Sequence, residues 1–231
     1  MVRISKEYDE RLKELLDSAQ QLFFEKGYQK TSVNDIIEEV GVAKGTFYHY
    51  FKTKSDLLDK LVERFTAGIH VETKKLAERT DLNALEKMNE FFALGRNFKA
   101  RNIELMKLLL KALYNEENLV MRHRMIRNRI KLTLPEFVKI IDQGIKEGVF
   151  NVTNSRELAE LIYYLGININ ELAGELMLTL SENPENIDII EGKIKAYESS
   201  IEKILGVAEG SISIADRDYI NMFRLEEEDK K

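Results

Sequence analysis

The chain has 231 residues, of which 44% are hydrophobic and 32% charged, and its 35 Lys and Arg against 40 Asp and Glu give a net charge of −5. This composition indicates a mildly acidic globular protein and excludes a disordered tail. The absence of cysteine excludes disulfides, zinc–thiolate sites, iron–sulfur clusters and thiol nucleophiles. No run reaches the roughly 18 to 20 apolar residues of a membrane span and the start is charged, so we expect a cytoplasmic protein without a membrane partner.

Helices are the expected secondary structure, because two prolines are too few for a chain built from many turns. The first helix is predicted over 6–26, where apolar residues recur at spacings of three and four until Gly27. Ser32 and Asp35 carry the signal of a helix start, and the short helix that follows ends at Gly41. Only residues 41–43 separate it from a third helix over 44–51.

The third helix is predicted to bury Phe47 and Phe51, which stand four residues apart, and to turn the other side outward. A new start at Thr53 opens a long helix to about residue 76. Further helices are predicted over 81–98, 101–113, 117–147, 155–181 and 185–205, with a short one over 216–223. Pro135 should kink or break the helix over 117–147.

Two short helices joined by three residues fit a helix-turn-helix, whose second helix enters the major groove of DNA. Between Gly41 and Lys54 the chain has three lysines and no carboxylate, so the overall negative charge does not exclude nucleic acid. Gly45 lets the backbone approach DNA, Thr46 can contact a base, and the other polar groups can reach phosphates. The predicted DNA-binding residues are Thr31, Lys44, Gly45, Thr46, Tyr48, His49, Thr53 and Lys54.

Two alternatives stay open for this segment. Aromatic residues at helical spacing, such as Tyr48 and Tyr50, are usually core residues, and a short cationic stretch is usually only a solvated face. A helical hairpin with a glycine bend also imitates a helix-turn-helix.

Residues 10–65 resemble the N-terminal domain of the TetR (tetracycline-repressor-like) family, most closely in the segments 31–36, 41–51 and 54–58. The segments 147–150 and 156–159 resemble the family more loosely. The resemblance implies a one-component transcriptional regulator, usually a repressor, that dimerises through its last two long helices and binds a small effector in the central helical bundle. The tail after Gly206 is longer than the usual end of the family.

We therefore expect an all-α fold with an N-terminal three-helix helix-turn-helix domain and a C-terminal helical bundle for ligand binding and dimerisation. The expected divisions are a DNA-binding domain (1–54), a connecting helix (55–78), a ligand-binding and dimerisation domain (79–206) and a C-terminal extension (207–231). The expected partners are a double-stranded DNA operator, a small-molecule effector of unknown identity and a second copy of the chain.

A dimer that reads two half-sites is expected because one reading helix makes too few contacts to select an operator. The helices over 155–181 and 185–205 have wider apolar faces than a one-sided helix needs. The alternative is that these faces only build the core of one protomer. The predicted interface residues are Leu158, Ile162, Leu165, Gly166, Ile169, Ile194, Tyr197 and Ile201.

For the effector, we expect a few hydrogen-bonding side chains within an apolar bundle. The candidates are Asn97, Arg101, Tyr114, Asn118 and Tyr163, although polar residues of this kind are more often surface or satisfied core residues. The segment 121–132 has five cations and no acid, and Arg124, Arg127 and Lys131 share one face. A solvated face, an anionic effector and ion pairs to an acidic partner surface are the three interpretations.

No enzyme, metal site or cofactor is predicted. His49, His70 and His123 do not have metal-ligand spacing, and the segment 41–46 lacks the order of a phosphate-binding loop. The alternatives to an effector-controlled repressor are a regulator without a small-molecule effector and a helical protein-interaction module.

Overall fold

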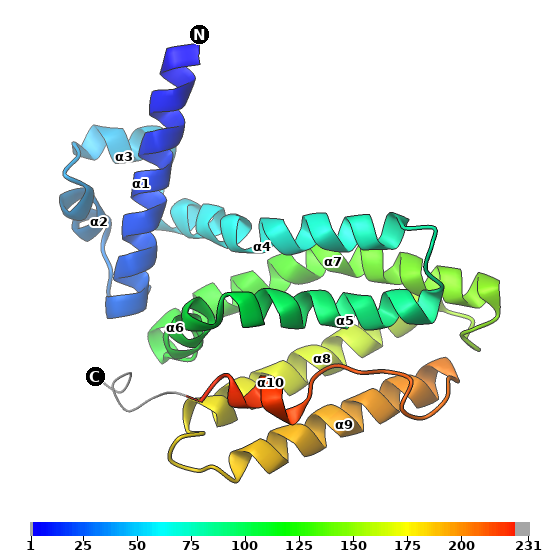
Figure 1. Ribbon diagram of the computed structural model, residues 1–231. Helices are drawn as coiled ribbons and strands as arrows, with labels where there is room; N and C mark the ends of the chain where they lie inside the picture. Colours follow the sequence, from blue (N-terminus) through cyan, green and yellow to red (C-terminus); the bar gives the residue numbers. More distant parts are fainter. Residues whose placement is uncertain (1, 225–231) are drawn as a thin grey trace. The chain divides into compact units, whose positions relative to one another are not determined.

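The computed structural model describes residues 2–224, and every regular element in that range is a helix, as predicted (Figure 1). Within this range no helix is both long and apolar enough to cross a membrane. The helices are α1 (Val2–Lys26), α2 (Val33–Val40), α3 (Lys44–Tyr50), α4 (Lys54–Glu78), α5 (Ala84–Arg101), α6 (Ile103–Leu113), the short 3₁₀ helix η1 (Glu116–Asn118), α7 (Leu119–Glu147), α8 (Ser155–Leu178), α9 (Asn186–Leu205) and α10 (Arg217–Asn221).

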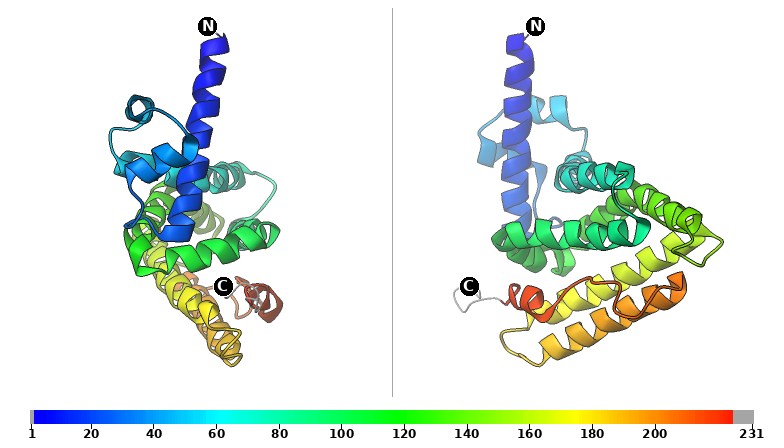
Figure 2. Two further views of the ribbon diagram at one scale, coloured as in Figure 1. Left: turned by 90° about the vertical axis from the view of Figure 1, so that its left-hand side faces the viewer. Right: turned by 45° about the vertical axis from the view of Figure 1, so that its right-hand side comes forward.

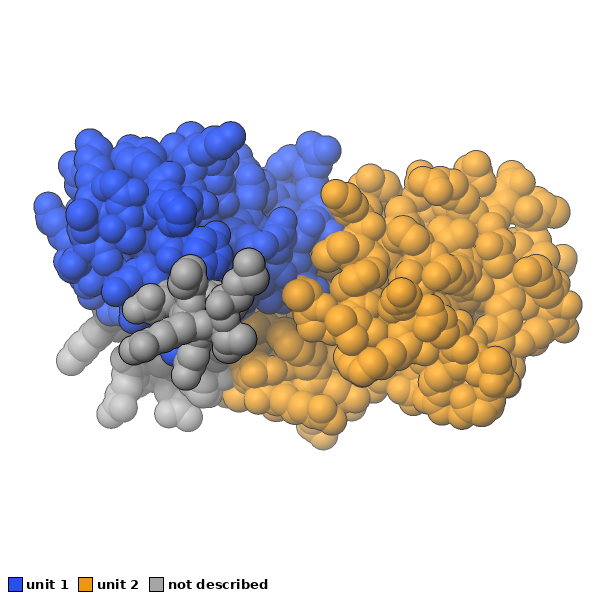
Figure 3. Space-filling view, turned by 90° about the horizontal axis from the view of Figure 1, so that it is seen from above, with its two compact units in different colours: residues 1–66, 108–128 blue, residues 67–107, 129–231 orange. Residues whose placement is uncertain are grey.

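The chain forms two compact units (Figure 3). Unit 1 consists of 1–66 and 108–128, and unit 2 consists of 67–107 and 129–231. Helices α4, α6 and α7 each contain a point at which the chain passes from one unit to the other. This division differs from the four expected segments, because 108–128 belongs with the N-terminal helices and the tail belongs with the C-terminal helices.

Unit 1 is built around the helix-turn-helix. Its core contains Leu15, Ala19, Phe23, Ile36, Phe47, Leu57 and Leu61, all fully buried. Ser32 and Asp35 form the predicted capping box at the start of α2, and Gly41 ends that helix with a φ of 70°. A left-handed backbone of this kind favours glycine. The three residues before α3 therefore turn the chain sharply enough to set α3 beside α2.

Unit 2 is a helical bundle with its own core, in which Met88, Phe137, Ile140, Ile162 and Ile201 are almost completely buried. Helices α8 and α9 pack against each other side by side (Figure 2). Tyr197 of α9 donates a hydrogen bond of 2.6 Å to the carbonyl oxygen of Ile162 in α8. A Cβ at Gly166 would lie 2.6 Å from the Tyr197 hydroxyl oxygen, so this contact requires glycine.

Several helix ends differ from the prediction by a few residues, and two departures from the prediction have a local cause. Helix α7 continues through Pro135 without a break. Proline removes one intrahelical hydrogen bond, and at this exposed position water can satisfy the carbonyl group that loses its partner. Helix α5 begins at Ala84 rather than near Asp81, because Asn83 forms a capping box with Glu86.

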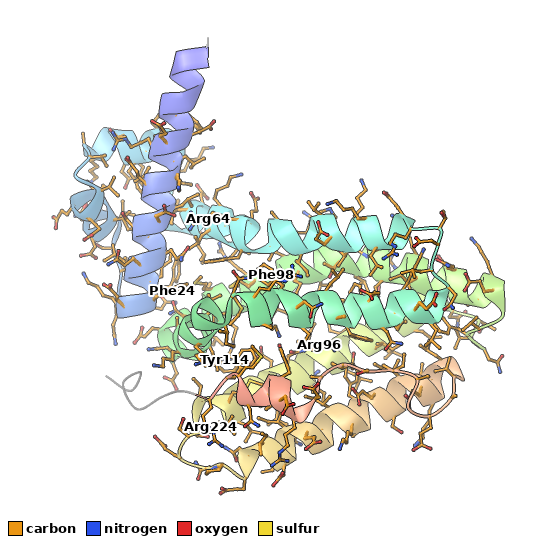
Figure 4. The ribbon with its side chains drawn as sticks, in the orientation of Figure 1. Phe24, Arg64, Arg96, Phe98, Tyr114 and Arg224 are labelled. Atoms are coloured by element: carbon orange, nitrogen blue, oxygen red, sulfur yellow. The ribbon has the colours of Figure 1, made fainter. Side chains whose placement is uncertain are left out.

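The described part of the tail, 207–224, packs against α9 and α5 within unit 2 (Figures 1 and 4). The carboxylates of Glu202 and Glu198 accept hydrogen bonds from the backbone N–H groups of Ile212 and Ile214. The guanidinium of Arg96 on α5 donates to the Ile214 carbonyl oxygen at 2.7 Å. The predicted short helix is present as α10, capped by Asp216, and 225–231 lie outside the described residues.

Candidate nucleic-acid interface

Helix α3 presents a polar face to solvent. Lys44, Gly45 and His49 are exposed, Tyr48 is 47% exposed, and Thr46 is partly exposed. Phe47 is fully buried beneath them and 5.7 Å from the Phe51 ring. Tyr48 is therefore a surface residue and not a core residue. Tyr50 is half-buried and packs 4.6 Å from the ring of Tyr8 in α1.

Tyr8 is a member of this surface that sequence reasoning missed. Its exposed ring also lies 6.1 Å from the His49 ring, edge to face. These contacts connect the early part of α1 to the end of α3. Tyr8 precedes the helix-turn-helix by more than 20 residues, so spacing alone offers no signal for the contact.

The position of a side chain at Gly45 faces open space. A Cβ built at this position would have no described atom within 4 Å, and the backbone is helical. Neither packing nor a left-handed φ requires glycine here. The fold therefore does not explain why this position is a glycine.

Thr31 and Lys54 are placed differently from the prediction. The Thr31 side chain is buried, and its hydroxyl donates to the Gly27 carbonyl oxygen at 2.8 Å. The Lys54 ammonium donates to the carbonyl oxygens of Tyr28 and Thr31 at 2.7 and 2.8 Å and lies over the Tyr28 ring. Both side chains thus hold the loop between α1 and α2 in place, and neither is offered to phosphate.

The start of α4 is a closed capping arrangement. The Asp56 carboxylate accepts the backbone N–H groups of Lys52 and Thr53, and the Thr53 hydroxyl accepts the N–H of Asp56 at 3.1 Å. These backbone donors are satisfied internally, although the Thr53 side chain is exposed. The predicted phosphate contact at the start of α4 therefore has fewer donors to offer than the sequence suggests.

The five predicted effector residues do not form one site. Asn97 and Arg101 of α5 are exposed. Tyr114, just after α6, belongs to unit 1 and lies under the guanidinium of Arg122 (Figure 4). Tyr163 of unit 2 is partly buried, and its hydroxyl pairs with that of Thr133.

Asn118, the remaining candidate, is a structural residue of unit 1. It is buried, accepts the Tyr28 N–H, and donates to the carbonyl oxygens of Phe23 and Ala112 at 3.1 and 2.9 Å. All the donor and acceptor positions of this amide that face the protein are used, so Asn118 joins 108–128 to the end of α1.

Most of the predicted dimer residues lie in the core of the protomer. Ile162, Gly166, Ile194, Tyr197 and Ile201 are buried between helices of unit 2, while Leu158 and Ile169 are partly buried. Of the eight residues only Leu165 is exposed. Leu165 is 44% exposed. It lies on a stripe of α8 with Leu161, which is 58% exposed, and Tyr164, which is 51% exposed.

Comparison with known proteins supports the assignment that this geometry favours. Residues 15–61 match the sequence model of the bacterial regulatory proteins of the tetR family. This segment contains α2, α3 and the start of α4. Residues 15–61 are therefore a DNA-binding domain of the TetR type. The chain is a DNA-binding transcriptional regulator, and α2 and α3 form its helix-turn-helix.

Relatives support the same assignment beyond the matched segment. The chain is 28% identical over 154 residues to the HTH-type transcriptional repressor KstR2 of Mycobacterium tuberculosis, covering 65% of this chain and 74% of the relative. It is 26% identical over 140 residues to the fatty acid metabolism regulator protein of Bacillus subtilis, covering 59% and 66%.

Solved structures show the same fold over most of this chain. SmeT, the repressor of the Stenotrophomonas maltophilia multidrug efflux pump SmeDEF, is 15% identical with a TM-score of 0.57, covering 89% of this chain and 96% of that chain. Reduced NemR of Escherichia coli is 17% identical with a TM-score of 0.55, covering 86% and 98%.

Proposed function

We propose that this chain is a TetR-family repressor that binds a palindromic DNA operator as a homodimer and leaves it when a small molecule binds in unit 2. The observation that best supports operator binding is the exposed, carboxylate-free face of α3, with open space at Gly45. In this proposal Gly45 and Thr46 face base edges, and Lys44, Tyr48 and His49 contact phosphates.

The homodimer is proposed to form through the exposed stripe of α8, which includes Leu165 but none of the other seven residues predicted from the sequence. Leu161, Tyr164 and Leu165 are large apolar side chains at helical spacing, and none is covered within the protomer. Such a stripe indicates an interaction surface. A two-fold axis there would give two α3 helices, which a palindromic operator requires about 34 to 36 Å apart.

Release of DNA requires a connection between the units, and three helices supply one. Helices α4, α6 and α7 are continuous across the division, so a ligand that favours one position of these helices in unit 2 also changes the balance of conformations in unit 1. A coupling free energy of about 1 to 3 kcal/mol would change operator affinity roughly 5- to 150-fold.

Selection of bound duplexes from a random library tests operator binding, and we expect a palindromic consensus. Leu165→Arg should place an unpaired charge in the dimer interface and give a monomer in size-exclusion chromatography with light scattering. Its affinity for the selected duplex should fall at least tenfold, because two linked half-sites become one.

Leu119→Arg is the matched control for this variant. Leu119 is a similarly exposed leucine at the start of α7 and is not part of the stripe on α8. This variant should remain dimeric and bind DNA normally. A Leu165→Arg protein that stays dimeric would contradict the proposed interface, and a library that yields no preferred duplex would contradict operator binding.

A further inference from the structure

Two cationic side chains of unit 2 repel each other, and neither has an acidic partner among the described residues. Lys99 is on α5 and Arg129 on α7. The Nε atom of Arg129 is buried and has no hydrogen-bond partner within the described part of the chain. Lys99 is partly buried, and its ammonium reaches only the Asn170 amide oxygen at 3.4 Å among the contacts found in the described residues.

The electrostatics of Lys99 agree with this arrangement. Burial and then the positive charge of Arg129 lower the pKa of Lys99 to about 8. No described carboxylate offsets these two effects. Two partly buried cations without a counter-charge destabilise a fold. Residues that break a rule of packing in this way are often kept for binding.

Hydroxyl and aromatic groups lie one helical turn from Arg129. The Thr133 hydroxyl donates to the Arg129 carbonyl oxygen at 2.9 Å and pairs with the Tyr163 hydroxyl. The Tyr163 ring lies 6.2 Å from Phe137, which in turn packs 4.8 Å from Phe91. An occupant that contacts both Arg129 and this aromatic region needs an anionic head and an apolar body.

We infer that Lys99 and Arg129 bind the anionic head of an amphipathic organic ligand, a carboxylate or a phosphate attached to an aliphatic chain. The site deepens the proposed function, since control of DNA binding by this ligand rests on that function. The inference also selects among the three interpretations of the cationic segment 121–132. Arg127 and Lys131 are exposed on the solvated face, whereas the Nε atom of Arg129 is buried and has no hydrogen-bond partner within the described residues.

Isothermal titration calorimetry of the full chain with decanoate, decyl phosphate and decan-1-ol tests the head group directly. We expect at least one of the two anions to bind at least tenfold more tightly than the alcohol, because only the anions supply a negative charge to Lys99 and Arg129. The tighter of the two anions identifies the head group. Equal binding of all three ligands, or no binding of either anion, would overturn the inference.

Variants locate the site. Lys99→Gln and Arg129→Gln should each reduce affinity for the preferred anion at least tenfold and leave affinity for the alcohol unchanged. Lys131→Gln and Arg127→Gln remove matched charges from exposed positions of α7 and should bind as the wild type does. If the exposed variants lose as much affinity as the inward ones, the assignment to Lys99 and Arg129 is wrong.

The effector role is measured separately from binding, by the affinity of the protein for its selected duplex with and without the preferred anion. If the anion binds without changing the affinity for DNA, the inferred site is supported and its role as an effector site is contradicted. If the protein binds DNA but neither anion, the proposed DNA-binding function is supported and the inferred site is overturned.

Discussion

At the scale of single residues, a substitution at Gly45 should affect stability and DNA binding in opposite directions. Alanine fits the helical backbone and the open space at this position. Gly45→Ala should therefore raise the free energy of unfolding by up to about 1 kcal/mol, because alanine favours the helix. The added methyl group should nevertheless weaken DNA binding severalfold. Urea unfolding and a gel-shift titration measure the two effects.

Gly95→Ala is the matched control, because Gly95 is also helical and has no described atom within 4 Å of its Cβ position. It should gain stability and keep its affinity for DNA. If Gly45→Ala binds DNA as tightly as Gly95→Ala does, the backbone at Gly45 does not approach the operator closely.

Asn118 illustrates the opposite case, a polar residue that the fold itself requires. Asn118→Ala leaves the Tyr28 N–H and the Phe23 and Ala112 carbonyl oxygens without their partner in a buried place. The free energy of unfolding should fall by about 1 to 3 kcal/mol or more. Urea unfolding checks this, with Asn183→Ala at an exposed turn as the control. Equal stability of the two variants would contradict the structural role of Asn118.

At the scale of elements, the tail depends on two carboxylates of α9. Burial raises the pKa of Glu198 above its ordinary value of 4.5, although backbone hydrogen bonds from Ile214 and Ala215 oppose this. Between pH 4.5 and the raised pKa the folded state binds more protons at this site than the unfolded state. The contribution of Glu198 to the free energy of unfolding therefore falls as pH rises through this window.

Glu198→Gln should remove this dependence, since glutamine does not titrate. The stability of the variant relative to the wild type should rise from about pH 4.5 upward and then level off. Urea unfolding of the variant and the wild type at several pH values measures the difference. A constant difference across the range would contradict the assigned shift of the Glu198 pKa.

The elements themselves were largely predictable from the sequence. The capping box of Ser32 and Asp35, the stop at Gly41 and the short helix after Asp216 follow from local chemistry and are present. The start of α5 was misplaced because Asp81 and Asn83 are both good capping residues, and only the partner Glu86 decides between them.

The direction of side chains was less predictable. From the sequence, Lys54 was predicted to contact phosphate. In the structure its ammonium donates to the carbonyl oxygens of Tyr28 and Thr31, more than 20 residues earlier in the chain. Helix α8 is apolar on two sides, so periodicity could not say whether Ile162 or Leu161 faces the core. Long-range contacts decide both questions.

At the scale of the whole molecule, the two units divide the proposed work. Unit 1 carries the face of α3, while unit 2 carries the exposed stripe of α8 and the cation pair of Lys99 and Arg129. The chain has a net charge of −5, but the segment 41–54 has three lysines and no carboxylate. A protein that is acidic overall can therefore bind DNA through one local surface.

The salt dependence of affinity for the selected duplex tests the central claim most directly. If a dimer neutralises about six to nine phosphates, the logarithm of affinity should fall against the logarithm of salt concentration with a slope of roughly −5 to −8. Lys44→Ala should reduce the magnitude of this slope by about two, one for each protomer. A flat response, or a slope that Lys44→Ala leaves unchanged, would contradict DNA binding through the exposed face of α3.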